Sequence, residues 1–209
     1  MAVRLVALAS SGAALRGRYS SAVRVIAGVA KGARLGPVPR GTRPVSDRVR
    51  EGLFSSLGEA VVGARVLDLY AGTGALGIEA LSRGAASATL VERSGPAAAA
   101  VRGNLERTHL ADRGDPETVE VTTFLRRTDK SAGPFDLVLC DPPYELGSTE
   151  LEVVLQELST GWLPKGPWTV VLTRGRRSST PVIPLHWVVA RRLGYGDSLV
   201  VLFREVRWA

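Results

Sequence analysis

The sequence predicts an open α/β fold, with a mostly parallel sheet covered by helices on both faces. Between residues 65 and 173, apolar runs of strand length alternate with helical segments, which is typical of a parallel sheet. The last part differs, because residues 186–191 and 198–203 are two strand-like runs joined by the short connection 194–197. Such a connection favours a hairpin. We therefore expect the parallel sheet to end in antiparallel strands.

The alternating region supplies most of the expected elements, each bounded by polar or turn residues. The expected strands cover residues 65–69, 88–92, 118–122, 135–140 and 168–173. The expected helices cover residues 75–82, 96–108 and 149–158, with a short helical piece near Phe124. In such sheets the carboxyl ends of the strands open onto one crevice, where ligands bind.

A short hairpin and a helix are expected before the sheet. Residues 23–26 alternate apolar and polar side chains, and residues 33–35 can return as a second strand after a glycine-containing turn. Ser46 is a good N-cap for a helix that runs to about Leu57. The apolar face of this helix would hold Val49, Leu53, Phe54 and Leu57, with Arg48 and Arg50 off that face.

The composition indicates one globular domain with a small appendage. The chain has 209 residues, of which 45% are hydrophobic and 22% charged, as in ordinary globular proteins. We expect a basic tail without fixed structure at residues 1–22, a hairpin and helix extension at residues 23–58, and the main domain at residues 59–209.

The charge balance and the single cysteine narrow the class of protein. A formal net charge of +7 favours a polyanionic partner such as nucleic acid, although an Arg-rich proteome would give the same balance. Cys140 is the single cysteine, so no disulfide can form within the chain and a reducing compartment such as the cytoplasm fits. One cysteine and two histidines argue against a zinc site. No apolar run approaches the roughly 18 residues of a membrane span.

A glycine-rich loop follows the first strand of the alternating region. Gly72, Gly74 and Gly77 fit the pattern G-x-G-x-x-G, and Glu92 ends the next strand 20 residues after Gly72. This context predicts a nucleotide-like ligand whose ribose diol meets the acid, and it fits both NAD and S-adenosylmethionine. Asp68 favours S-adenosylmethionine, because a carboxylate there suits a cationic methionine group and opposes a pyrophosphate.

An unusual corner, Asp141-Pro142-Pro143-Tyr144, follows the apolar strand 135–140. The prolines stiffen the backbone and push Asp141 out of the helical region. The Asp141 carboxylate and the Pro142 carbonyl can accept the two N–H bonds of a nucleobase amino group, which frees the nitrogen lone pair for attack. Tyr144 can stack on the base. These four residues alone are equally compatible with a plain turn.

With these motifs, the chain resembles the class I S-adenosylmethionine-dependent methyltransferases that act on nucleobase amino groups. More narrowly, it resembles the bacterial small-subunit ribosomal RNA guanine-N2 methyltransferases of the RsmD type. The resemblance runs from about Val23 to Phe203, and its most specific segment is residues 43–54. The other segments that carry it are residues 24–28, 68–77, 79–85, 141–144 and 195–197.

The resemblance implies a Rossmann-like, seven-stranded, mostly parallel sheet with a C-terminal antiparallel hairpin. It implies a monomeric cytoplasmic enzyme that uses S-adenosylmethionine and no metal. The implied substrate is a guanine of ribosomal RNA in partly assembled small subunits. The implied catalytic residues are Asp141, Pro142, Pro143 and Tyr144. The implied cofactor contacts are Asp68, Tyr70, Ala71, Gly72, Gly74, Leu76, Glu92, Arg93 and Thr122.

Basic side chains are expected to contact RNA phosphates, with a solvated surface as the alternative. The candidates are Arg24, Lys31, Arg34, Arg40, Arg43, Arg48, Arg50, Arg174 and Arg176.

Two segments depart from the family's pattern. Members usually carry Asp or Asn after the third strand, near the adenine amino group, whereas residues 121–125 contain no acid. The stretch after the fifth strand often contains glutamates, whereas residues 173–177 read Thr-Arg-Gly-Arg-Arg.

Other functions remain open on the sequence alone. The same corner fits an adenine-N6 or protein-glutamine methyltransferase, and the fold fits a non-catalytic RNA-binding assembly factor. An NAD-dependent oxidoreductase would need a hydride-accepting site that the sequence does not show. Attack by Cys140 on a cytosine ring is disfavoured, because this residue ends an apolar strand and is expected to be buried.

Overall fold

The computed structural model describes residues 23–36, 45–127, 129–179 and 181–206. The expected tail and the candidates Arg40 and Arg43 lie outside these ranges. The strands are β1 Arg65–Leu69, β2 Ser87–Val91, β3 Gly114–Glu117, β4 Leu137–Cys140, β5 Thr169–Gly175, β6 Trp187–Tyr195 and β7 Ser198–Glu205. The helices are α1 Asp47–Leu57, α2 Ala75–Ser82, α3 Gly95–Arg107, α4 Val121–Leu125 and α5 Ser148–Leu158, with the 3-10 helix η1 Gly58–Val61 after α1.

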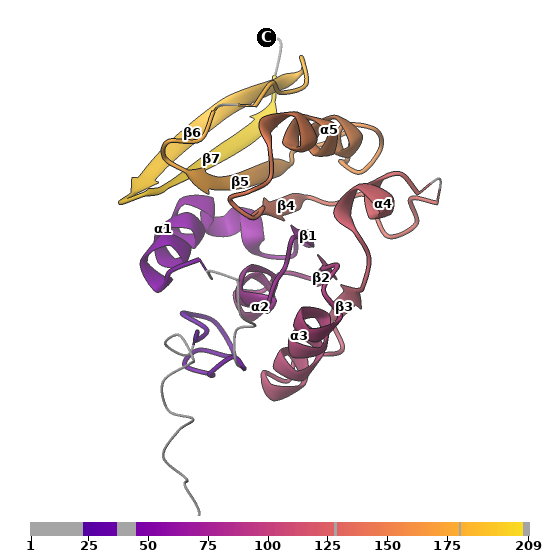
Figure 1. Cartoon of the computed structure of the whole chain (residues 1–209). Coiled ribbons are helices and arrows are strands. Elements are labelled where there is room, and N and C mark those ends of the chain that lie inside the picture. Colours follow the sequence, from indigo (N-terminus) through magenta and orange to yellow (C-terminus); the bar gives the residue numbers. More distant parts are fainter. Residues whose placement is uncertain (1–22, 37–44, 128, 180, 207–209) are drawn as a thin grey trace, which may run out of the picture.

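The seven strands form one sheet in the order β3-β2-β1-β4-β5-β7-β6. The strands from β3 to β5 in this order are parallel, and β7 is antiparallel to both β5 and β6. The predicted Rossmann-like sheet with a C-terminal hairpin is therefore confirmed (Figure 1). Among the described residues, no helix is long and apolar enough to cross a membrane.

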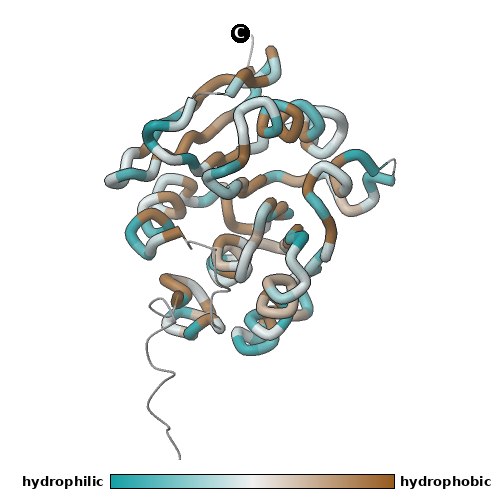
Figure 2. Tube along the Cα trace, in the orientation of Figure 1, coloured by the Kyte–Doolittle hydropathy of each residue, from teal (hydrophilic) through white to brown (hydrophobic). Residues whose placement is uncertain are grey.

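Helices cover both faces of the sheet, as the alternating pattern predicts. α1, α2 and α3 lie on one face, and α4 and α5 lie on the other (Figure 1). Each face has its own apolar cluster: Val66 of β1 joins Ile78 of α2, whereas the next residue, Leu67, joins Leu155 of α5. Side chains of a strand alternate between faces, so a strand covered on both sides is apolar throughout. Figure 2 shows this apolar centre with hydrophilic residues toward the outside.

The first helix begins and packs as predicted. The Ser46 hydroxyl accepts a hydrogen bond from the Val49 N–H at 3.4 Å, which satisfies one free donor at the start of α1. Val49, Leu53, Phe54 and Leu57 are all buried against the first face of the sheet. This helix therefore belongs to the same core as the sheet.

Arg50 is fully buried, so its predicted place off the apolar face and its expected contact with phosphate are both wrong. Its Nη2 donates to the Arg24 carbonyl and to the Asp47 carboxylate, each at 2.7 Å. Its Nη1 lies 3.7 Å from the carboxylate of Glu79 in α2, which is equally buried. A buried guanidinium needs such partners, because removing a charge from water is costly.

The predicted N-terminal hairpin is present as a short antiparallel pairing around the bridge between Arg24 and Arg34. The N–H groups of Val25 and Leu35 donate to the carbonyls of Ala33 and Val23 at 3.0 and 2.8 Å. The segment is also held by α2, where the Glu79 carboxylate accepts the N–H groups of Ile26 and Ala27 at 2.7 and 3.1 Å. Ser82, one turn later, donates its hydroxyl to the Ala27 carbonyl at 2.6 Å. The N-terminal segment is thus attached to the helix that begins at the glycine-rich loop.

The prediction of a strand at residues 118–122 is wrong. β3 ends at Glu117, and α4 begins at Val121. The Glu120 carboxylate accepts the N–H groups of Thr122 and Thr123 at 2.7 and 3.2 Å, which caps a helix where the β-branched residues suggested a strand. Capping outweighs the intrinsic preference of a short segment.

We predict that Glu79→Gln lowers the free energy of unfolding by about 3 kcal/mol, because Arg50 then loses a buried countercharge. Urea denaturation measures this change. Arg48→Ala, which removes an exposed arginine from the same helix, should change stability by no more than about 0.5 kcal/mol. Equal stabilities for the two variants would contradict a structural role for the buried pair.

Candidate active site

The carboxyl ends of three neighbouring strands bring the predicted functional residues to one edge of the sheet. β1 pairs with β2 on one side and with β4 on the other, all in parallel. The glycine-rich loop follows β1, Glu92 follows β2, and Asp141 follows β4. Because parallel strands end at the same edge, these three features share one crevice.

The glycine-rich loop turns through left-handed backbone conformations. Tyr70, Gly72 and Gly74 have φ values of 62°, 58° and 79°. Glycine adopts this region freely, whereas Tyr70 does so at a cost, a kind of strain that clusters at functional sites. A Cβ at Gly77 would lie 2.8 Å from a methyl carbon of Leu90, so this glycine allows α2 to approach the sheet closely. The three glycines thus each serve the turn or the packing.

Two carboxylates fix the loop. Glu92 accepts the N–H groups of Gly72 and Ser94 at 2.9 and 2.8 Å, and Asp68 accepts the N–H of Gly77 at 2.8 Å. Burial raises the pKa of Asp68 to about 8, the Gly77 N–H opposes this rise, and the charges of Asp141 and Glu92 add to it. A cation bound beside Asp68 would favour its ionised form.

The Asp-Pro-Pro-Tyr corner presents two acceptors that nothing in the described part of the chain occupies. Pro142 and Pro143 have no N–H, so they cannot bond the Asp141 carboxylate as residues after an Asp often do. Burial alone raises the pKa of Asp141 to about 7. Among the described residues, no backbone N–H donates to the Pro142 carbonyl either. The pair is therefore available to a ligand amino group.

Tyr144 supplies a stacking surface beside these acceptors. Tyr144 is 53% exposed, and its ring lies against Gly175 of β5, where a Cβ would be 3.1 Å from the ring. The ring forms one wall of an open hollow of about 600 Å³, which we call the Tyr144 hollow. Its other walls are residues 175–178, Gly196 and Asp197.

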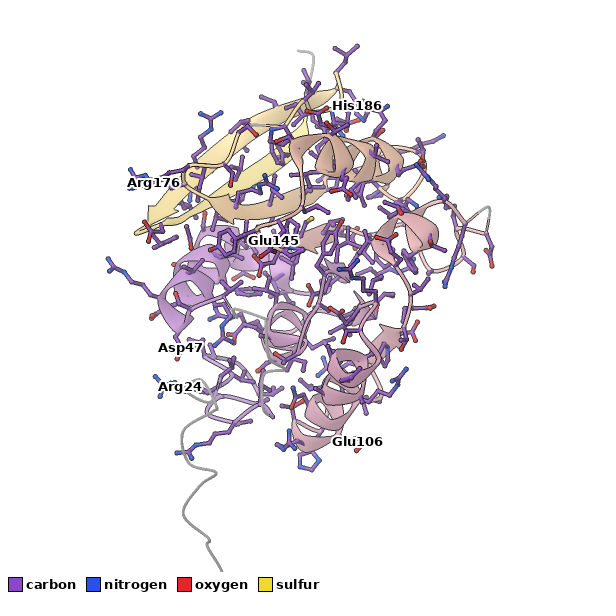
Figure 3. The ribbon with its side chains drawn as sticks, in the orientation of Figure 1. Arg24, Asp47, Glu106, Glu145, Arg176 and His186 are labelled. Atoms are coloured by element: carbon purple, nitrogen blue, oxygen red, sulfur yellow. The ribbon has the colours of Figure 1, made fainter. Side chains whose placement is uncertain are left out.

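The predicted RNA-contacting cations fall into three groups. Arg24, Lys31, Arg34, Arg48 and Arg176 are exposed, with Arg24 paired to Asp47 at 3.1 Å (Figure 3). Arg50 is buried, as described above. Arg174 is half-buried, and its Nη1 donates to the Leu146 carbonyl at 3.1 Å, so it holds the loop after the corner instead of lying on an open surface.

Glu120 is a site residue that the sequence did not point to. It lies three residues after the end of β3 and immediately before residues 121–125, because that strand ends earlier than expected. Burial raises the pKa of Glu120, but hydrogen bonds from Thr122 and Thr123 outweigh this and hold the pKa below its usual range. Those bonds all reach Oε2, so Oε1 has no donor among the described residues. The acid before the helix could have been found as an N-cap.

Thr122 and Cys140 are the remaining candidates from the sequence. The Thr122 hydroxyl donates to the Glu120 carboxylate, so this side chain supports the acid that follows β3. Cys140 is buried, and burial raises the pKa of its thiol, so the nucleophilic thiolate is disfavoured. Within the described ranges, no cluster of three or more His, Cys, Asp or Glu side chains could hold a metal ion.

The strand order, the glycine-rich loop and the acid after β2 define a class I methyltransferase, the class whose methyl donor is S-adenosylmethionine. The family model "Conserved hypothetical protein 95" matches residues 23–204. The chain belongs to this family, which is that of ribosomal RNA small subunit methyltransferase D.

Individual relatives agree with this membership. Ribosomal RNA small subunit methyltransferase D of Escherichia coli K12 is 37% identical over 188 residues, covering 89% of this chain and 91% of the relative. Putative rRNA methyltransferase YlbH of Bacillus subtilis is 31% identical over 184 residues, covering 88% and 99%. The solved structure of the putative methyltransferase yhhF from Escherichia coli superposes with a TM-score of 0.78 at 33% identity, covering 90% and 100%.

Proposed function

We propose that this protein transfers the methyl group of S-adenosylmethionine to the N2 amino group of a guanine in small-subunit ribosomal RNA. The observation that carries the proposal is the pair of open acceptors, the Asp141 carboxylate and the Pro142 carbonyl, in the crevice of the glycine-rich loop. The names of the relatives support ribosomal RNA as the substrate class. We also propose that the substrate is a partly assembled small subunit and that the protein acts as a monomer.

The residues of the crevice fit the proposed cofactor. The loop N–H groups and Glu92 would hold the ribose, because each carboxylate oxygen of Glu92 still has a free lone pair after its backbone bond. Asp68 would face the cationic methionine end. Glu120 Oε1 would accept the adenine amino group, which supplies the contact that seemed to be missing from the sequence. When bound, the cofactor supplies an electrophilic methyl group on a positively charged sulfur.

The corner would make the guanine amino group nucleophilic. Asp141 and Pro142 would accept its two N–H bonds, which turns the nitrogen lone pair toward the methyl group. The amino nitrogen would bond to the methyl carbon as that carbon separates from the sulfur, and the nitrogen would then lose one proton, which the Asp141 carboxylate can accept. Tyr144 would hold the base by stacking. Positioning and preorganised acceptors supply most of the catalysis in such a direct transfer.

Glu120→Ala should weaken binding of S-adenosylhomocysteine by about tenfold, because the adenine amino group then has no charged acceptor. Glu120→Gln, which keeps an oxygen acceptor and the helix cap, should bind almost as tightly as the unaltered protein. Isothermal titration calorimetry measures both dissociation constants. Unchanged affinity in Glu120→Ala would remove Glu120 from the cofactor site.

Asp141→Ala should lower turnover at pH 8 by at least about 100-fold, the usual effect of removing a preorganised polar group, with cofactor binding retained. At saturating S-adenosylmethionine, whose cation favours ionised Asp68, turnover of the unaltered protein should rise with pH through about 7, because the raised pKa of Asp141 leaves it protonated below that value. Asp141→Asn, whose amide oxygen accepts without titrating, should show a lower and flat profile. Normal turnover in Asp141→Ala, or an unchanged rise in Asp141→Asn, would refute the assignment.

The proposed reaction is tested by supplying labelled S-adenosylmethionine with undermethylated small ribosomal subunits and identifying the labelled nucleoside by digestion and mass analysis. We expect N2-methylguanosine. N6-methyladenosine would keep the mechanism and replace the substrate base. No label on subunits or free RNA, despite cofactor binding, would instead favour a protein-glutamine substrate or a non-catalytic assembly factor.

A further inference from the structure

The Tyr144 hollow lies at the end of the active-site edge, beyond the corner. β5 and β7 pair so that Gly175 lies opposite Ser198, which places the Gly196-Asp197 turn of the hairpin beside the carboxyl end of β5. The Arg176 N–H donates to the Asp197 carbonyl at 2.7 Å and joins the two connections. The hollow is therefore built by the fold, from the β5–β6 connection and the hairpin turn together.

This hollow is separate from the proposed cofactor crevice but shares one wall with the catalytic corner. None of its walls comes from the loop after β1 or from the acid after β2. The order along the sheet is β2, β1, β4 and β5, followed by β7. Cofactor residues, the amino-binding corner and the hollow thus follow one another along a single edge. Tyr144, which belongs to both the corner and the hollow, lies at their boundary.

Two free guanidinium groups give the hollow its charge. Arg176 and Arg177 are the central residues of a turn closed by the Ser178 N–H on the Gly175 carbonyl at 2.9 Å, and both are exposed. Figure 3 shows Arg176 at the outer edge of the molecule, beside β5 and the hairpin. Within the described residues, neither guanidinium lies within 4.0 Å of a carboxylate.

Some other arginines of the described residues are held by protein groups instead. Arg126 is paired to Glu157 at 3.0 Å and Arg127 to Glu117 at 3.1 Å, both away from the hollow. Arg174, two residues before Arg176, is turned inward onto the Leu146 carbonyl. The arginines of residues 174–177 therefore have different roles. Arg174 supports the loop after the Asp-Pro-Pro-Tyr corner, whereas Arg176 and Arg177 remain available to an anion.

We infer that the Tyr144 hollow holds the sugar and the flanking phosphates of the flipped target nucleotide, with Arg176 and Arg177 bound to those phosphates. This inference rests on the proposed function and specifies how the substrate strand enters the site. A base stacked on Tyr144 and gripped at the corner must have left its helix, and its backbone then lies at the mouth of the pocket. Planar guanidinium groups bind phosphate oxygens with two parallel hydrogen bonds.

Asp197 is the one acid among the residues that line the hollow, and its charge opposes a phosphate on its side. A ribose 2′-hydroxyl suits that place, because it can donate to a carboxylate and distinguishes RNA from DNA. The walls thus provide cations for phosphates, an acceptor for the sugar and a ring for the base. This set matches one ribonucleotide in an unpaired strand.

The test compares Arg176→Ala/Arg177→Ala with a charge-matched control, Lys165→Ala/Arg204→Ala. Lys165 and Arg204 are not buried and lie near the opposite end of β5 and β7. The dissociation constant for undermethylated small subunits is measured at several salt concentrations, together with turnover at saturating substrate. Methylation by the unaltered protein, measured in parallel, reports on the proposed function independently of the variants.

We expect the Arg176/Arg177 variant to bind subunits about tenfold more weakly than the control, with turnover at saturation within about twofold. Its plot of log affinity against log salt should be shallower by about 1.4, because each single-strand phosphate that is no longer neutralised reduces the slope by about 0.7. Equal affinities and equal salt slopes in the two variants would overturn the inference. So would a loss confined to turnover, which would indicate a positioning role for the arginines.

Discussion

The two prolines after Asp141 are the constraint on which the proposed chemistry depends. A carboxylate at the end of a buried strand would ordinarily accept N–H groups from the next residues of its own turn. Pro142 and Pro143 have none to offer, so the Asp141 carboxylate is half-buried and has no local partner, on a backbone that the prolines stiffen. Its unsatisfied hydrogen-bonding capacity, shared with the Pro142 carbonyl, is what a substrate amino group would fill.

The rest of the fold places other groups around this corner in a fixed order. Parallel pairing of β2, β1 and β4 sets Glu92, the glycine-rich loop and Asp141 side by side. The antiparallel β7 returns the hairpin turn to the same edge, next to β5. On the other side of α2, the Arg50–Glu79 contact holds the N-terminal segment and α1 to the helix that begins at the loop. One sheet edge thereby meets both the proposed cofactor and the proposed RNA strand.

The sequence predicts the helices and strands correctly where local signals agree with the tertiary contacts. The bounds of β1 and α2 match the prediction because apolar runs, glycines and turn residues coincide. Prediction fails where a residue distant in the sequence determines burial. The periodicity of α1 gives no sign that Arg50 is buried beside Glu79. Prediction also fails for β3, since the cap formed by Glu120 outweighs the β-branched residues after it. The Tyr144 hollow depends on the β5–β7 register, which the sequence does not specify.

A structure of the protein on an undermethylated small subunit, with S-adenosylhomocysteine bound, would show which groups hold the target amino group. We expect a guanine out of its helix, with its amino nitrogen within about 3.2 Å of both the Asp141 carboxylate and the Pro142 carbonyl oxygen, and with its ring against Tyr144. A target amino group held by other acceptors, with Asp141 unoccupied, would contradict this expectation.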